Sequence, residues 1–185
     1  MVNVSKIVSG GQTGADRAAL DYAIEHGISH GGWCPAGRKA EDGAICDRYT
    51  LQETSSANYL VRTEWNVRDS DGTLILTIRP SLSGGSKRTA DLASKHLKPC
   101  LHLHAGDSVE RGAARLGEFL ALNRISVINI AGSRASKEPE VGAFVRAVLS
   151  AAGIAPTTSV SYPMTEEKFG THPDWEDEQP PPYSA

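Results

Sequence analysis

The sequence has few cysteines and no long hydrophobic run. Cys34, Cys46 and Cys100 are the only cysteines among 185 residues, and no two of them form a C-x-x-C pair. Such spacing argues against a disulfide framework or a structural zinc site and favours a reducing compartment. No stretch approaches the roughly 18 apolar residues of a membrane span, and the first residues lack the basic and apolar segments of a signal peptide. We therefore expect a cytoplasmic protein with no membrane partner.

The sequence also carries little net charge, a formal −3 at pH 7. The charge is unevenly distributed, because residues 154–185 contain six acids and one base, Lys168. The preceding 153 residues therefore have a charge of about +2, the difference between −3 and −5. DNA-binding surfaces usually carry a strong basic patch, so we expect no nucleic-acid partner.

The pattern of apolar residues predicts one α/β domain. Short β-type runs alternate with helical segments from the first residues onward. The expected strands cover residues 4–9, 28–34, 73–78, 100–104 and 125–130, and the expected helices cover 15–25, 55–70, 87–97, 108–123 and 139–152. The run 73–78 is typical of a parallel strand that is buried on both faces. This order predicts a mainly parallel sheet of about five strands between layers of helices.

The predicted domain covers residues 1–153. Residues 154–185 are rich in proline, threonine, serine and acids and show no sustained period. We interpret them as an acidic, Pro-rich C-terminal tail. The segment Pro180–Tyr183 matches a ligand of WW domains, but a solvated low-complexity terminus explains this composition better.

Three loops rich in glycine and hydroxyl residues each lead from a strand into a helix. They are Gly10–Asp16, Ser83–Asp91 and Ala131–Lys137. The carboxyl ends of parallel strands lie at one edge of a sheet, so the loops should converge there. Small residues expose backbone amides, and a helix N-terminus carries partial positive charge. With Lys87, Arg88, Arg134 and Lys137 close by, the loops predict a site for a phosphate or another oxyanion.

The first loop matches neither of the common nucleotide motifs. Ser9 stands two positions before Gly11, where a dinucleotide fingerprint needs glycine. Gly14 is followed by Ala15 instead of the lysine of a phosphate-binding P-loop. We therefore expect neither NAD nor a nucleoside triphosphate as the ligand.

Further side chains are candidates for a role at this edge. Asp16 could hold a hydroxyl or amine of a ligand, or act as a helix cap. Cys100, His102 and His104 lie on one face of a strand, and His104, at its carboxyl end, is the better functional candidate of the two histidines. A metal site would need a further convergent ligand, and we expect no protein-ligated metal. The aromatic residues Tyr59, Trp33 and Trp65 could stack on a ring or simply pack.

Several blocks of the sequence resemble the family of putative molybdenum carrier proteins. They are GGQTGADRAALD at 10–21, GGWCPAGRKAEDG at 31–43, RTEWNV at 62–67, SDGTLI at 70–75 and NIAGSR at 129–134. The resemblance covers residues 4–153. It implies a Rossmann-like three-layer α/β sandwich, related to the lysine-decarboxylase-like nucleotide-binding proteins. It also implies an oligomeric carrier that binds molybdenum cofactor, a pterin with a dithiolene and a terminal phosphate, and delivers it to a molybdoenzyme or an insertase.

We expect the phosphate to lie on the first loop, opposite the loop that follows the third strand, with arginines neutralising the remaining oxygens. Cys34 is expected to be a packed thiol and not a metal ligand. The predicted cofactor-binding residues are Gly10, Gly11, Gln12, Thr13, Gly14, Asp16, Arg38, Gly84, Gly85, Ser86, Lys87, Arg88, Ser133 and Arg134. No catalytic residue is assigned, so this hypothesis favours a binding protein over an enzyme.

Two alternative functions stay open. The first is a phosphoribohydrolase that cleaves a base from a nucleoside monophosphate. The related cytokinin-activating enzymes carry P-G-G-x-G-T-x-x-E, whereas Ser83–Asp91 lacks the proline and the glutamate, so Asp16 or Asp91 would have to replace the acid. The second is a nucleotide-sensing module that signals through a partner.

Overall fold

The computed structural model describes residues 2–156 and contains one central sheet. All neighbouring strands in this sheet are parallel. In spatial order the strands are β3 (Ser29–Gly31), β2 (Lys6–Val8), β10 (Val127–Gly132), β8 (Gly72–Thr77) and β9 (Cys100–His104). The five strands are those expected from the sequence, and the prediction of a mainly parallel sheet is confirmed.

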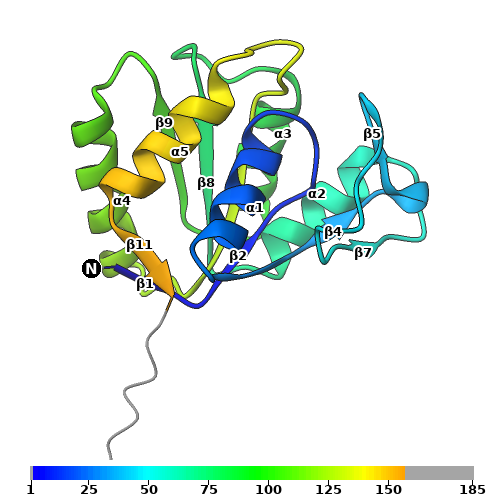
Figure 1. Ribbon diagram of the computed structural model, residues 1–185, viewed down its shortest axis with the longest axis horizontal. Helices are drawn as coiled ribbons and strands as arrows, with labels where there is room; N and C mark the ends of the chain where they lie inside the picture. Colours follow the sequence, from blue (N-terminus) through cyan, green and yellow to red (C-terminus); the bar gives the residue numbers. More distant parts are fainter. Residues whose placement is uncertain (1, 157–185) are drawn as a thin grey trace, which may run out of the picture.

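Helices cover both faces of the sheet (Figure 1). One face carries α1 (Ala15–Glu25), α4 (Val109–Leu122) and α5 (Val141–Ala151), and the other carries α2 (Tyr59–Arg68) and α3 (Gly84–Lys95). The fold is therefore the predicted Rossmann-like three-layer sandwich. None of the helices within residues 2–156 is both long enough and apolar enough to cross a membrane.

The buried strands explain the layered core. Every residue of β8 is buried, because α3 packs on one of its faces and α5 on the other. Ser108 caps α4 by accepting a hydrogen bond from the Arg111 amide. Helix α3 begins three residues earlier than predicted. Gly84 starts it with φ of +51°, a conformation that favours glycine, so the glycines expected in a loop form its first turn instead.

The predicted single strand at residues 4–9 is two strands, which corrects the sequence prediction. The chain bends at Ser5, whose amide donates to the carbonyl of Ser126. Before this bend, β1 (Val2–Val4) pairs in parallel with β11 (Ile154–Pro156). Strand β11 begins one residue after the predicted domain end and belongs to this folded unit. The rest of the predicted tail, with its WW-type motif, lies outside the described residues.

A long excursion between β3 and α2 forms a small subdomain beside α1 (Figure 1). Its short elements are β4 (Trp33–Cys34), the 3-10 turn Ala36–Arg38, β5 (Lys39–Ala40), β6 (Gly43–Ala44) and β7 (Gln52–Glu53). A second apolar cluster, which includes Cys34, Ile45 and Leu51, packs it against Leu20 of α1. The Arg38 guanidinium donates to the carbonyls of Ile45, Cys46, Tyr49 and Leu51 at 2.9 to 3.2 Å.

The turn after β2 and the end of β10 approach each other backbone to backbone. Gly14, with φ of +80°, lies against the Ser133 carbonyl, and a Cβ atom there would overlap it. A Cβ atom on Gly132 would overlap the carbonyl oxygen of Leu76. In this close approach the Ala15 amide donates to the Ser133 carbonyl at 3.1 Å. Glycine at 14 therefore lets the first and third loops meet at the carboxyl edge, and glycine at 132 lets the end of β10 lie against the backbone of β8.

We predict that Gly132→Ala destabilises the protein by roughly 1–3 kcal/mol or more, because backbone atoms cannot move aside as the end of a side chain can. Gly85→Ala is the matched control, since nothing lies within 4 Å of a Cβ atom there. That variant should keep or slightly raise the free energy of unfolding, by about 0.4–1 kcal/mol. Urea denaturation measures both. Equal stability of the two variants would contradict the proposed role of Gly132.

Candidate functional site

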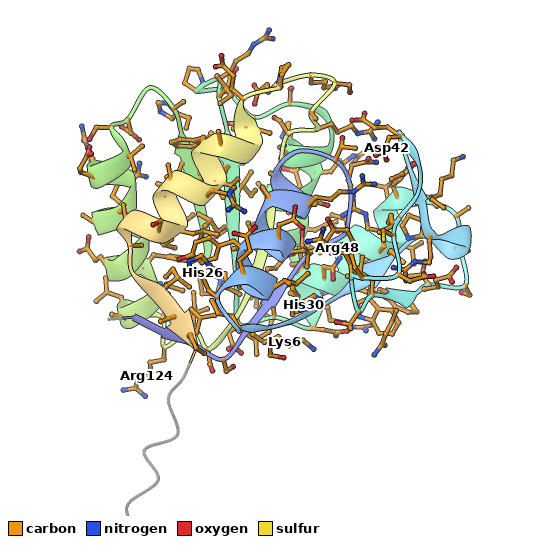
Figure 2. The ribbon with its side chains drawn as sticks, in the orientation of Figure 1. Lys6, His26, His30, Asp42, Arg48 and Arg124 are labelled. Atoms are coloured by element: carbon orange, nitrogen blue, oxygen red, sulfur yellow. The ribbon has the colours of Figure 1, made fainter. Side chains whose placement is uncertain are left out.

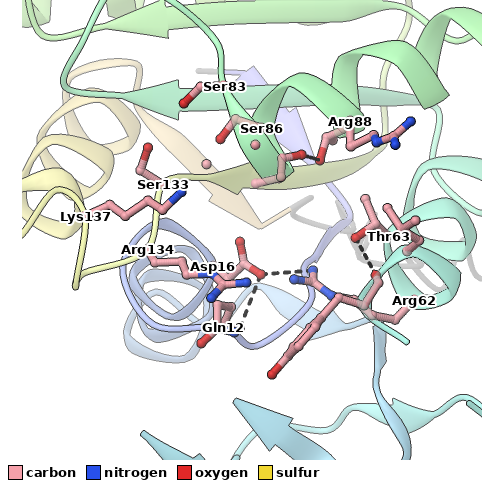
Figure 3. A pocket seen from close by; sticks show the side chains of 17 residues that line it. Gln12, Asp16, Arg62, Thr63, Ser83, Ser86, Arg88, Ser133, Arg134 and Lys137 are labelled. Atoms are coloured by element: carbon pink, nitrogen blue, oxygen red, sulfur yellow. Dashed lines mark hydrogen bonds and ion pairs between the residues drawn. The ribbon is translucent and has the colours of Figure 1, made fainter. Parts of the chain in front are cut away.

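The three predicted loops converge on one cavity of about 330 Å³ at the carboxyl edge of the sheet (Figure 3). Helices α1 and α3 leave this edge on opposite faces of the sheet, which is where open α/β sheets usually bind ligands. The lining residues are Gln12 and Asp16 from the first loop and α1; Tyr59, Leu60, Arg62 and Thr63 from α2; Ser83, Gly84, Gly85, Ser86, Arg88 and Thr89 around the start of α3; and Ala131, Gly132, Ser133, Arg134 and Lys137 from the third loop.

The first loop is filled by the protein's own groups. The Arg62 guanidinium covers Gly10, and the side chain of Leu51 covers Gly11. The Thr13 hydroxyl donates to the Glu41 carboxylate and accepts a hydrogen bond from the Ala135 amide. None of Gly10, Gly11, Thr13 and Gly14 is a lining residue of the cavity.

Glu41 ties the excursion to the first and third loops. Its carboxylate accepts hydrogen bonds from the Ser136 hydroxyl at 2.6 Å and the Ser136 amide at 3.3 Å. The Arg134 guanidinium lies 3.9 Å from the same carboxylate. Hydrogen bonds from Ser136 and Thr13 hold the pKa of Glu41 below its ordinary value. An acidic side chain thus occupies the hydroxyl and amide donors on which a phosphate at Thr13 would depend.

Gln12 presents an unpartnered donor beside the cavity. Its side chain is buried, and its Oε1 atom accepts hydrogen bonds from the amides of Thr13 and Glu41, both at 3.0 Å. Because two amide donors define Oε1, the other terminal atom is Nε2, which has no partner among the described residues. A buried donor without a partner is costly, and a ligand oxygen would remove that cost.

A buried ion pair forms the neighbouring wall (Figure 3). The Arg62 Nη1 atom lies 3.2 Å from the Asp16 carboxylate, and the two side chains are 13% and 5% exposed. Asp16 also accepts a hydrogen bond from the Gln12 amide at 3.2 Å. This bond ties Asp16 to the turn before α1, but α1 has no side-chain cap, so Asp16 is not the cap that the sequence offered as one alternative. Asp16 lines the cavity. Arg62 Nε is buried and is a second donor with no partner among residues 2–156.

The first turn of α3 leaves backbone donors for a ligand. Ser83 precedes the helix without a side-chain cap, and the amides of Gly84, Gly85 and Ser86 have no acceptor within the described part of the chain. The Lys137 Nζ atom lies 3.5 Å from the position that a Cβ atom on Gly84 would occupy. The aligned peptide dipoles of this 12-residue helix add positive potential at the same place.

The cavity has a positive lining and one aromatic ring. Its basic residues are Arg62, Arg88, Arg134 and Lys137, against the single acid Asp16. The Arg134 guanidinium lies over the Tyr59 ring at 5.4 Å from the centroid. This lining suits a ligand that combines an anionic group with a flat ring.

The structure places the predicted site residues in two groups. Those that line the cavity are Gln12, Asp16, Gly84, Gly85, Ser86, Arg88, Ser133 and Arg134. Those that do not are Gly10, Gly11, Thr13, Gly14, Arg38 and Lys87. Arg38 supports the excursion, and Lys87 forms an exposed pair with Asp91. The assignment of all these residues to a bound cofactor stays a prediction.

The remaining sequence candidates lie elsewhere. Cys34 is fully buried, and burial raises the pKa of its thiol. His102 shares a hydrogen bond with the Thr77 hydroxyl, and His104 lies 3.8 Å from the Asp107 carboxylate. Among residues 2–156, no cluster of three or more His, Cys, Asp or Glu side chains could hold a metal ion. Trp33 and Trp65 pack edge to face at 4.7 Å between centroids.

From α2 the sequence offered only Tyr59, as a ring that could stack on a ligand, and Arg62 and Thr63 were not predicted. Tyr59, Arg62 and Thr63 line the cavity because spacings of three and four residues place them on one helical face. The sequence shows this spacing, so it could have indicated a shared helical face. The sequence does not show which end of α2 meets the carboxyl edge, because a long excursion separates α2 from β3.

The buried Asp16 carboxyl predicts a pH-dependent stability. Burial raises its pKa above the ordinary 3.8, although Arg62 and the Gln12 amide oppose the shift. The folded protein therefore holds this proton more tightly than the unfolded chain, and stability is lost as pH rises from 3.8 through the raised value. We expect Asp16→Asn to gain stability relative to the native protein over this pH range, as measured by urea denaturation. If the native protein instead becomes more stable than the variant as pH rises, the ion pair with Arg62 outweighs the effect of burial on the Asp16 carboxyl.

Comparisons with known proteins agree with this fold. The model of the circularly permutated YpsA SLOG family matches residues 7–152. A similar solved structure is the crystal structure of a putative molybdenum carrier protein from Syntrophus aciditrophicus SB. It is 47% identical, with a TM-score of 0.79, over 80% of this chain and 94% of that chain. A comparison with curated proteins finds no match. The chain therefore belongs to the circularly permutated YpsA SLOG family and, within it, to the putative molybdenum carrier proteins.

Proposed function

We propose that the protein binds molybdenum cofactor in this cavity and carries it without transforming it. The observation that carries the proposal is the pair of buried, unpartnered donors, Gln12 Nε2 and Arg62 Nε, beside a positively charged cavity. The similar protein from Syntrophus aciditrophicus is described as a molybdenum carrier, which supports the same cargo. A pterin with a terminal phosphate offers both acceptor atoms and negative charge.

The phosphate is assigned to the first turn of α3. The free amides of Gly84, Gly85 and Ser86 and the Lys137 ammonium can donate to it. The first loop is the poorer position, since Glu41 already holds Thr13. This assignment moves the phosphate from the loop predicted by the sequence to the loop that faces it.

The pterin ring is assigned to the wall formed by α2 and the first loop. Tyr59 offers a flat surface, and the Gln12 and Arg62 donors can bind ring oxygen and nitrogen atoms. The molybdenum is cargo held by the dithiolene of the cofactor itself. The proposal therefore needs no metal ligand from the protein and assigns no catalytic residue.

The proposal includes the wider role of a carrier. A homo-oligomer in the cytoplasm would hold the cofactor and pass it to a molybdoenzyme or an insertase. The cavity opens at the carboxyl edge, beside the turn of the excursion that carries Glu41 and Asp42. Figure 2 shows Asp42 at this end of the molecule and Arg124 at the opposite end. An acceptor would approach the end near Asp42.

The test is anaerobic purification from a host that makes the cofactor, followed by denaturation, oxidation and chromatography with pterin fluorescence. We expect a pterin peak close to one equivalent of protein. The matched variant is Gln12→Glu, which keeps an acceptor for the Thr13 and Glu41 amides, removes the unpartnered Nε2 donor and should lower pterin recovery. Folded native protein without pterin, from a host shown to contain the cofactor, would contradict the proposal.

We predict that Arg134→Ala weakens the binding of inorganic phosphate by about tenfold, because a hydrogen bond to a charged group is lost. The melting temperature should stay nearly unchanged, since Arg134 is half-exposed and its contacts with Tyr59 and Glu41 are weak ones. Titration calorimetry and thermal unfolding measure the two effects. A fall in melting temperature without a change in phosphate affinity would make Arg134 a structural residue.

A nucleoside monophosphate phosphoribohydrolase is the second candidate. Asp16 lines the cavity, as such an enzyme requires of its acid, whereas Asp91 does not. The carboxylate of Asp16 is already paired with Arg62, which favours a binding role. Release of free base from nucleoside monophosphates, abolished in Asp16→Asn, would favour the enzyme.

A further inference from the structure

A second cavity of about 230 Å³ adjoins the site at the same edge of the sheet. It shares Ser83, Ser86, Ser133 and Lys137 with the first cavity. The remaining lining residues are Thr77, Arg79, Ser81 and Glu138. The two cavities are therefore adjacent lobes of one groove, which runs from the start of α1 past the end of β10 to the loop after β8.

Glu138 builds the wall of the second lobe. Its carboxylate accepts hydrogen bonds from the amides of Ile78 at 2.7 Å and Arg79 at 3.2 Å. Although burial raises the pKa of Glu138, these amides and the Ser133 hydroxyl hold it below its ordinary value. The acid thus joins the loops after β8 and β10, and its negative charge is already compensated by backbone donors.

The other polar groups of the second lobe are positive or neutral. Arg79 and Lys137 form no ion pair within residues 2–156, and the hydroxyls of Ser81, Ser83 and Ser86 surround the same space. The two lobes together contain the basic residues Arg62, Arg79, Arg88, Arg134 and Lys137 and the acids Asp16 and Glu138. Arg62 is paired with Asp16, and Arg134 lies 3.9 Å from Glu41. The basic side chains of the two lobes that have no ion pair among residues 2–156 are Arg79, Arg88 and Lys137.

We propose that the second lobe binds a second phosphoryl group, so that the site takes ligands with two linked phosphates. The inference rests on the proposed function, because the first phosphate lies on the first turn of α3. Lys137 lines both lobes and would bridge the two phosphates, while Arg79 reaches only the second. The ligand class is a nucleoside diphosphate or a pterin cofactor extended by a nucleotide, which is a pyrophosphate-linked dinucleotide other than NAD.

Arg79→Gln is a suitable test of the second lobe. The hydrogen bonds of Arg79 with Glu138 and with the Thr77 hydroxyl use only its backbone amide and carbonyl, and its side chain acts on Glu138 only through its charge. The substitution therefore removes the charge and keeps the loop. Arg88→Gln is the control within the site, because Arg88 lines the first lobe alone. Arg124→Asn is the remote control, since asparagine tolerates its positive φ of 52°.

The experiment is titration calorimetry with inorganic phosphate and inorganic pyrophosphate at matched ionic strength. Every basic site favours the more highly charged anion to some extent, so the decisive quantity is the ratio of the two affinities in each variant. We expect Arg79→Gln to lower pyrophosphate affinity about tenfold and leave phosphate affinity unchanged. Arg88→Gln should lower both by a similar factor, and Arg124→Asn neither. Titration of a nucleoside diphosphate against a pyrophosphate-linked dinucleotide then distinguishes the two sources.

Equal affinities of the native protein for phosphate and pyrophosphate would overturn the proposal that the second lobe binds a second phosphoryl group, and would leave the proposed function intact. The same holds if Arg79→Gln, folded by circular dichroism, lowers both affinities equally or neither. A native protein that binds neither anion would overturn the phosphate assignment of the proposed function as well.

Discussion

The close approach of two backbones at Gly14 is the constraint on which this site depends. It brings the turn after β2 against the end of β10 and directs the Ala15 amide to the Ser133 carbonyl. A helix N-terminus can bind an anion only with amides that are free. At the start of α1 the Ala15 amide is bonded to the Ser133 carbonyl, so the first loop holds two parts of the protein together and does not present this amide to a phosphate.

The proposed function therefore assigns the anion to α3. Its first turn has no side-chain cap and lines the cavity beside the first and third loops. The third loop contributes from the opposite side, through Lys137 in both lobes. Two neighbouring strands that carry helices on opposite faces thus produce one donor-rich edge, and the proposed ligand position is the one where the protein leaves its own donors unpaired.

The excursion between β3 and α2 is held in place by hydrogen bonds and a small apolar cluster, and this placement brings Glu41 to the first and third loops. Arg38 gathers four carbonyls, and a small apolar cluster seats the excursion on α1. Glu41 can then reach the first and third loops at once. Residues 31–43 therefore build a scaffold that borders the site, and none of them lines either lobe.

Local patterns in the sequence were sufficient to predict the strands and helices of the central sandwich and to place the expected oxyanion site at the carboxyl edge of the sheet. Apolar runs predicted five strands and five helices, because such patterns act over a few residues. The edge could be predicted because parallel strands bring the loops after β2, β8 and β10 to the same side of the sheet. Tertiary structure alone decided which donors stay free. Arg62 joins Asp16 across 46 positions of sequence, Glu41 reaches Ser136 across 95, and β11 pairs with β1 from the other end of the domain. Such contacts depend on how elements pack, which no local pattern encodes, and they moved the predicted anion site from the start of α1 to the start of α3.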